Sequence, residues 1–163
     1  MGKGTTFTIS IPVSKNLPPE SALKKKAGFP EEIKRKLNIL LVDDEEVICS
    51  TLKRFLESKG HRVTTSLKAE EGFKLFKKDK FDVVLSDITM PGMDGIELIR
   101  EMKEKNKDSK IIAITGHVRQ QKLEEVKDAG AEEVLIKPFR NSSLYETISR
   151  LLSEKRKEDE KEI

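Results

Sequence analysis

Apolar and polar residues follow two alternating patterns from residue 37 onward. Short runs rich in β-branched and other apolar residues predict five strands, at residues 37–42, 62–66, 81–86, 110–114 and 133–136. Between these runs, apolar side chains recur at every third or fourth position, which predicts helices over residues 45–59, 69–76, 94–102 and 118–129 and from residue 141 onward. This alternation predicts a doubly wound α/β fold with one five-stranded parallel sheet.

Glycines and capping residues mark the ends of several predicted helices. Gly60 and Gly130 directly follow two helical segments, and glycine is the preferred residue after the last turn of a helix. Asp94 and Asn141 stand at the start of two others, where a side-chain oxygen can accept a hydrogen bond from a free backbone N–H group. His61, which follows Gly60 at the start of a strand, is predicted to lie at the surface.

The amino-terminal part of the chain does not share this alternation. Apolar side chains occupy every second position from Phe7 to Val13, which predicts one half-buried strand. The following segment contains a proline pair, a glycine and a run of three lysines, and is predicted to be a linker. The predicted organisation is a strand-like arm at residues 1–15, a linker at 16–36, the α/β domain at 37–155 and a charged tail at 156–163.

The length and charge of the chain argue against several classes of function. With 163 residues, the chain holds one α/β domain and an arm rather than two full domains. Its net charge of +3 is small against 37% charged residues of interspersed sign, so nucleic-acid binding is not expected. No apolar run is long enough to span a membrane and no signal peptide is visible, so we expect no membrane contact. The single cysteine, Cys49, cannot form an internal disulfide, which favours a cytoplasmic location.

Chemically distinctive side chains stand where four of the predicted strands end. Asp43 and Asp44 follow the first strand, Asp87 follows the third, Thr115 the fourth and Lys137 the fifth. The carboxyl ends of parallel strands line one shared crevice, which is where such folds bind ligands. Because successive side chains of a strand face opposite ways, Asp43 and Asp44 must lie on the turn that leaves the strand. We therefore expect three carboxylates, one hydroxyl group and one ammonium group to meet at this edge.

These five residues in this order resemble the receiver domain of two-component response regulators, and the resemblance extends from residue 37 to the end of the chain. It implies a flavodoxin-like sheet with the strand order 2-1-3-4-5. It also implies a role for each residue: Asp87 is the phosphoacceptor, Asp43, Asp44 and Asp87 hold Mg2+, Thr115 and Lys137 contact the phosphoryl group, and Thr89 and His117 tune the lifetime of the aspartyl phosphate. Receivers usually have a cis bond where this chain has Lys137-Pro138, and an aromatic residue where it has Val134.

Electrostatics at the crevice favour the same cation. Three carboxylates repel one another by about 4 kcal/mol per contact at ~4 Å and an effective dielectric constant near ~20. The ammonium group of Lys137 offsets one charge, and a single divalent ion would neutralise the remainder. Oxygen ligands and an incoming phosphoryl group favour Mg2+. In the mechanism that the resemblance implies, Asp87 attacks the phosphoryl group, the product draws Thr115 inward, and residues 116–129 shift.

The arm resembles a second family. Its sequence from Gly2 to Pro12 is similar to the closing GxGTxFxxxxP strand of sensor histidine kinase catalytic domains. A kinase domain, a linker and a receiver in this order imply the carboxyl-terminal part of a hybrid histidine kinase. The ATP-binding motifs of such kinases are absent, so we expect a phosphoacceptor signalling domain that assists its own phosphorylation and dephosphorylation, and not an enzyme. The expected partners are a histidine kinase or a histidine phosphotransferase, and the lone strand predicts a homodimer formed through the arm.

Three alternatives remain open. A free-standing single-domain response regulator would have the same site. A Mg2+-dependent aspartyl-phosphate hydrolase of the haloacid dehalogenase kind also uses an acid at a strand end, but its DxD motif and cap insertion are missing here. A nucleotide or flavin binder of similar topology would need a glycine-rich loop after the first strand, where this chain has Asp43 and Asp44.

Overall fold

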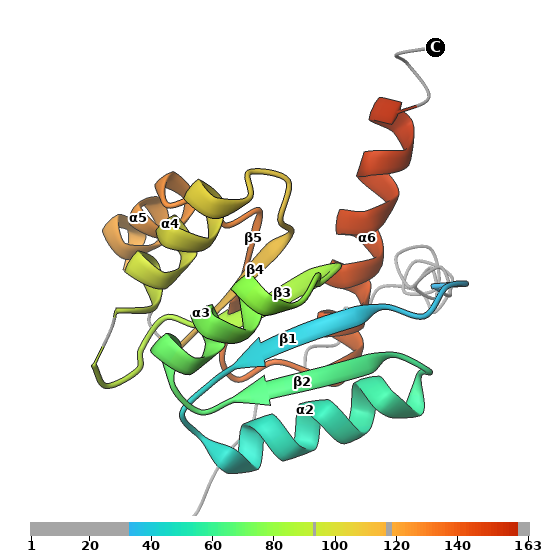
Figure 1. Cartoon of the computed structure of the whole chain (residues 1–163), viewed down its shortest axis with the longest axis horizontal. Coiled ribbons are helices and arrows are strands. Elements are labelled where there is room, and N and C mark those ends of the chain that lie inside the picture. Colours follow the sequence, from blue (N-terminus) through green and yellow to red (C-terminus); the bar gives the residue numbers. More distant parts are fainter. Residues whose placement is uncertain (1–32, 93, 117–118, 160–163) are drawn as a thin grey trace, which may run out of the picture.

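The structure, a computed structural model, describes residues 33–92, 94–116 and 119–159. The predicted arm, most of the predicted linker, His117 and the end of the charged tail lie outside the described residues. Within the described part, five strands alternate with five helices, as the sequence predicts (Figure 1). The strands are β1 (Asn38–Val42), β2 (Arg62–Ser66), β3 (Val83–Asp87), β4 (Ile111–Thr115) and β5 (Glu133–Ile136). The helices are α2 (Glu46–Ser58), α3 (Ala69–Lys78), α4 (Gly95–Lys105), α5 (Gln120–Asp128) and α6 (Asn141–Asp159).

All five strands form one parallel sheet in the order β2-β1-β3-β4-β5 (Figure 1). This order confirms the predicted flavodoxin-like topology. The register aligns the carboxyl ends of the strands, since Val42 pairs with Ser86 and Thr115 pairs with Ile136. Residues that follow these pairs therefore emerge at the same edge of the sheet, where open α/β folds place their binding sites.

Helices cover both faces of the sheet, and each face has its own hydrophobic core. Helices α2 and α6 pack on one face, where Leu56 and Ile148 belong to the same buried cluster as Leu41 of β1. Helices α3, α4 and α5 pack on the other face, where Met102 belongs to the same cluster as Leu40. Leu40 and Leu41 fall in different cores because neighbouring side chains of a strand face opposite ways. The central strands are therefore buried on both sides, which explains their continuous apolar sequence.

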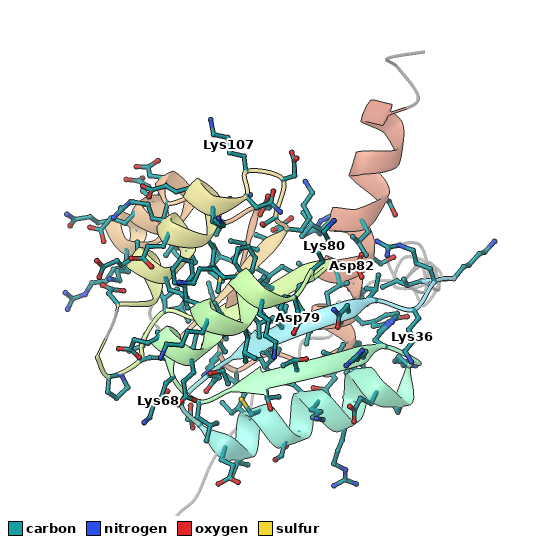
Figure 2. All side chains as sticks on the ribbon, in the orientation of Figure 1. Lys36, Lys68, Asp79, Lys80, Asp82 and Lys107 are labelled. Carbon is teal, nitrogen blue, oxygen red and sulfur yellow. The ribbon has the colours of Figure 1, made fainter. Side chains whose placement is uncertain are left out.

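The chain enters the sheet at the edge opposite the carboxyl ends of the strands. Asp82 accepts hydrogen bonds from Arg35 Nη1 and from the backbone N–H of Asn38, both at 2.7 Å. Figure 2 shows Lys80 and Asp82 towards this amino-terminal end of β1, and Lys68 at the other end of the sheet. The residues that precede β1 are thus anchored away from the cluster of strand-end side chains.

Helix α4 begins in direct contact with the end of β3. The carboxylate of Asp94 accepts a hydrogen bond from the backbone N–H of Ile96 at 3.0 Å, which confirms the predicted cap. Gly95 packs so closely that a Cβ atom there would overlap the carbonyl oxygen of Asp87 and the Cα atom of Ile88. Only glycine fits this approach, so the Asp94-Gly95 pair fixes the position of the loop that follows Asp87.

His61 is buried, and its predicted surface position is wrong. Only 4% of its surface is exposed, its Nδ1 atom accepts a hydrogen bond from the backbone N–H of Leu37 at 3.3 Å, and its ring stacks on Tyr145 at a centroid distance of 5.7 Å. Tyr145 lies on α6, far along the chain, so the local sequence around His61 carries no sign of this cover.

Two predicted helix stops agree with the structure and one predicted cap does not. Gly60 and Gly130 follow α2 and α5 with φ angles of +88° and +106°, which confirms both predicted stops. Asn141 is wrongly predicted as a cap, because it is the first residue of α6, and the N–H of Leu144 donates to the carbonyl oxygen of Arg140 instead. No helix within the described ranges has the length and apolar character needed to cross a membrane.

Candidate functional site

Three acidic residues meet at the carboxyl edge of the sheet, where the sequence predicts them. Asp43 and Asp44 lie directly after β1, on the turn that leads into α2, and Asp87 is the last residue of β3. Asp43 and Asp87 are 0% and 4% exposed, whereas Asp44 is open to solvent. One carboxylate oxygen from each of the three lies within 4.8 Å of the other two. At this separation the negative charges repel one another strongly unless a cation lies among them.

Lys137 places its ammonium group among these carboxylates. It directly follows β5, and its Nζ atom lies 2.6 Å from Asp87 Oδ2, 2.9 Å from Asp43 Oδ2 and 3.3 Å from Glu45 Oε1. Burial alone lowers the pKa of a lysine, but the hydrogen bonds to Asp87 and Asp43 outweigh it and raise the pKa of Lys137 above its ordinary value. The group therefore stays protonated at neutral pH. The peptide bond from Lys137 to Pro138 is cis, as the resemblance implies.

A single ammonium group does not balance the acidic cluster. Burial raises the pKa of Asp43 above its ordinary value, although hydrogen bonds from Lys137 and from the backbone N–H of Glu45 act in the opposite direction. The three acidic residues offer only carboxylate oxygens as metal ligands. Because Asp44 is exposed, water can reach one side of the acidic cluster. This donor set fits Mg2+, which prefers one or two carboxylates and keeps several of its waters.

Two predicted threonines contact residues of this site through their backbone atoms. The backbone N–H of Thr89 donates to Asp87 Oδ1 at 2.7 Å, which orients the carboxylate, while the Thr89 side chain is exposed. Thr115 is the fully buried last residue of β4, and its carbonyl oxygen accepts a hydrogen bond from the backbone N–H of Lys137 at 2.7 Å. The structure therefore brings four of the predicted strand ends together, and His117 alone of the predicted site residues falls outside the described ranges.

Two further residues, which the sequence pattern did not indicate as site residues, contact the acidic cluster and Lys137. Glu45 reaches Lys137, and Cys49 donates from Sγ to the carbonyl oxygen of Asp43 at 3.3 Å. Burial, followed by the charge of Asp43, raises the pKa of the Cys49 thiol to about 11, so the thiol stays protonated and acts as a donor. Glu45 directly precedes α2 in an extended conformation and Cys49 lies in the first turn of that helix, so the only indication in the sequence is that both closely follow the Asp43-Asp44 pair.

The fold and this edge define a flavodoxin-like α/β domain whose site combines a buried acid on a central strand, a pair of acids and a lysine. The chain belongs to the response regulator receiver domain family, which matches residues 39–149. Receiver domains are signalling domains of two-component systems and not classical enzymes.

Individual relatives agree with this assignment. Sensor protein EvgS of Escherichia coli O157:H7 is 31% identical over 150 residues, which cover 92% of this chain and 12% of EvgS. The chain thus spans only a small part of the length of this relative. A CheY-like receiver domain from Methanospirillum hungatei JF-1 has a TM-score of 0.73 and 31% identity, covering 76% of this chain and 99% of that one. TrrA of Thermotoga maritima, solved in complex with Mg2+-BeF, has a TM-score of 0.65 and 36% identity, covering 72% and 99%.

Proposed function

We propose that Asp87 accepts a phosphoryl group from a phosphohistidine, with Mg2+ held by Asp43, Asp44 and Asp87. The observation that carries this proposal is the position of Lys137, whose Nζ atom contacts Asp87 Oδ2 at 2.6 Å and Asp43 Oδ2 at 2.9 Å. Phosphoryl transfer needs a nucleophile, a metal site and a fixed positive charge next to the transferred oxygens. The carboxyl edge of this sheet supplies residues for all three.

Each residue of the site would have a separate role in the phosphoryl transfer. The carboxylate of Asp87, oriented by the N–H of Thr89, forms a new P–O bond as the P–N bond of the donor breaks. The departing ring nitrogen keeps the electron pair of that bond, and the imidazole leaves as a neutral group because its other ring nitrogen carries a proton. The protonated Lys137 neutralises charge on the transferred oxygens, and the hydroxyl group of Thr115 donates to one of them. When bound, Mg2+ supplies further positive charge to the same oxygens. We assign Thr89 and His117 to tuning the hydrolysis of the product.

The product would change the contacts of the domain with other proteins. Added phosphate charge at Asp87 would draw Thr115 inward and shift residues 116–129. The large apolar residues that are exposed in the described part are Val47, Leu67 and Ile136, and each lies on a segment at the carboxyl edge of the sheet. An apolar rim around a polar site suits the docking of a histidine kinase or a histidine phosphotransferase.

We further propose that the chain is part of a hybrid histidine kinase and that it acts in the cytoplasm. The arm motif from Gly2 to Pro12 supports this assignment. So does the similarity to sensor protein EvgS, which covers 150 of the 163 residues and must therefore begin ahead of the receiver domain.

Intact-mass spectrometry after incubation with phosphoramidate and Mg2+ tests the phosphoacceptor proposal. The native chain is expected to gain one phosphoryl group, Asp87→Asn is expected to gain none, and omitting Mg2+ should sharply reduce the yield. Phosphorylation that persists in Asp87→Asn would contradict the assignment of Asp87. Repeated turnover of the donor without a stable phosphorylated protein would instead favour the aspartyl-phosphate hydrolase.

A further inference from the structure

Glu45 carries a charge next to the site that the proposed mechanism does not use. An ammonium group has three hydrogens to donate. Those of Lys137 are directed to three carboxylates, with Nζ at 2.6 Å from Asp87, 2.9 Å from Asp43 and 3.3 Å from Glu45. A phosphoryl oxygen on Asp87 can therefore reach the ammonium group only by replacing one of these three partners.

The three contacts differ in a way that selects the partner to be replaced. The side chain of Asp43 is 0% exposed, so breaking its contact would leave a buried charge without its partner. The carboxylate of Asp87, 5% exposed, loses its own charge when it is phosphorylated, and its contact with Lys137 passes to the phosphoryl oxygens, whose charge is larger. The contact with Glu45 is the longest of the three, and the Glu45 side chain is 60% exposed. Water can solvate the Glu45 carboxylate as soon as the lysine leaves it, so this contact costs least to break.

The start of α2 does not depend on the Glu45 carboxylate. Glu45 occupies the N-cap position, where Ser, Thr, Asp and Asn are preferred, and its side chain makes no capping hydrogen bond. Its backbone N–H donates to Asp43 Oδ1 at 2.9 Å, which fixes the residue against the acidic cluster whatever its side chain does. A substitution that removes only the charge should therefore leave the helix and the cluster in place.

We infer that Glu45 is a positioning residue that acts through Lys137. Its carboxylate holds the ammonium group in the free protein and gives it up when a phosphoryl group arrives on Asp87. The inference rests on the proposed function and deepens it. Because the Glu45 charge competes for Lys137 and also repels an incoming anion, it lowers the affinity of the site for the phosphoryl group. The released carboxylate would also alter the surface beside the exposed side chain of Val47.

Titration of the full chain with beryllium fluoride at saturating Mg2+ tests this inference, because the fluoride complex is a non-covalent substitute for the phosphoryl group. Glu45→Gln is expected to bind it about two- to fivefold more tightly than the native chain, the effect of one exposed ion pair. The gain should shrink as salt is added, since the Glu45 charge is exposed. Glu46→Gln is the matched control: it removes the same charge from the adjacent exposed residue, for which the described structure gives no ion pair with Lys137, and it should bind like the native chain.

Three results would overturn the inference: equal affinity in both variants and the native chain, weaker binding by Glu45→Gln, or a gain that salt does not reduce. A failure of the proposed function looks different. In that case the native chain itself neither binds beryllium fluoride nor becomes phosphorylated on Asp87. If the native chain does both and Glu45→Gln behaves identically, only the role of Glu45 is removed.

Discussion

Among single residues, His61 illustrates how the core holds a polar side chain in one protonation state. The residue is 4% exposed, its Nδ1 atom accepts the backbone N–H of Leu37, and its ring stacks on Tyr145. The buried Nε2 atom has no hydrogen-bond partner among the described residues. A ring nitrogen that accepts a hydrogen bond carries no proton, so the folded protein holds the neutral imidazole.

The protonation state of His61 predicts a pH dependence of stability. Burial, followed by the charge of Arg35, lowers the pKa of His61 below its ordinary value. The stabilisation from the neutral ring is therefore complete above the unfolded-state pKa of about 6.5, and is lost as the pH falls through that value towards the folded-state pKa. Between about pH 7.5 and about pH 5.5, we expect the free energy of unfolding to fall more in the native chain than in His61→Gln.

Urea denaturation at the two pH values measures this difference. Protonation of carboxylates also destabilises the protein in acid, but it affects both chains, so the difference between them isolates His61. His117→Gln removes the only other histidine and should lose stability as steeply as the native chain. An equally steep loss in His61→Gln would contradict the assignment.

Among the elements, the junction between β3 and α4 controls where Asp87 lies. A Cβ atom on Gly95 would overlap the carbonyl oxygen of Asp87 and the Cα atom of Ile88. Asp94 caps α4 one residue earlier through the N–H of Ile96, so the helix cannot simply move away from the strand without losing its cap. Any larger side chain at position 95 should therefore displace the phosphoacceptor loop.

We expect Gly95→Ala to lower the free energy of unfolding by about 1–3 kcal/mol, the usual cost of overpacking a buried site, and to slow phosphorylation of Asp87. Gly116→Ala is the matched control, because nothing lies within 4 Å of a Cβ atom there, and its stability should change by less than about 0.5 kcal/mol. Urea denaturation and intact-mass spectrometry give the two quantities. Equal stability of the two variants would show that the β3–α4 contact is not tight.

The five strands and the meeting of acids at one edge could be predicted because both follow from local patterns, whereas the strand order could be predicted only through the resemblance to receiver domains. Apolar runs define the strands, and parallel packing then brings whatever follows them together. The cover of His61 by Tyr145 could not be predicted, since α6 lies far along the chain. The contact of Glu45 with Lys137 joins residues 92 positions apart, and an acid at a helix start gives no indication of a partner at that distance.

In the molecule as a whole, the segment that leads into β1 and the candidate site lie at opposite ends of the parallel strands. Asp82 anchors Arg35 and Asn38 at the amino-terminal edge, whereas Lys137 and the carboxylates occupy the carboxyl edge. The segment before residue 33 is therefore connected to the domain at the end of the sheet that lies away from Asp87. Changes to the arm should alter the assembly of the chain without altering phosphorylation of Asp87.

The sequence of the arm leads us to predict a homodimer. Its alternating sequence predicts a strand with one apolar face, which would be unstable alone in water and could pair with the same strand of a second copy. Light scattering should therefore give the mass of a dimer for the native chain and of a monomer after deletion of residues 1–15. Asp87 should remain a phosphoacceptor in both, because the deletion leaves the carboxyl edge unchanged.

A pair of single substitutions separates this strand pairing from a general effect of the deletion. Ile9→Asp places a charge on the predicted apolar face and should give a monomer, because the charge would be buried between the two arms. Ser10→Asp adds the same charge on the opposite face of the same strand and should leave the dimer intact. Equal masses for the two variants would remove the arm as the interface, since only a strand with two distinct faces can tell these neighbouring positions apart.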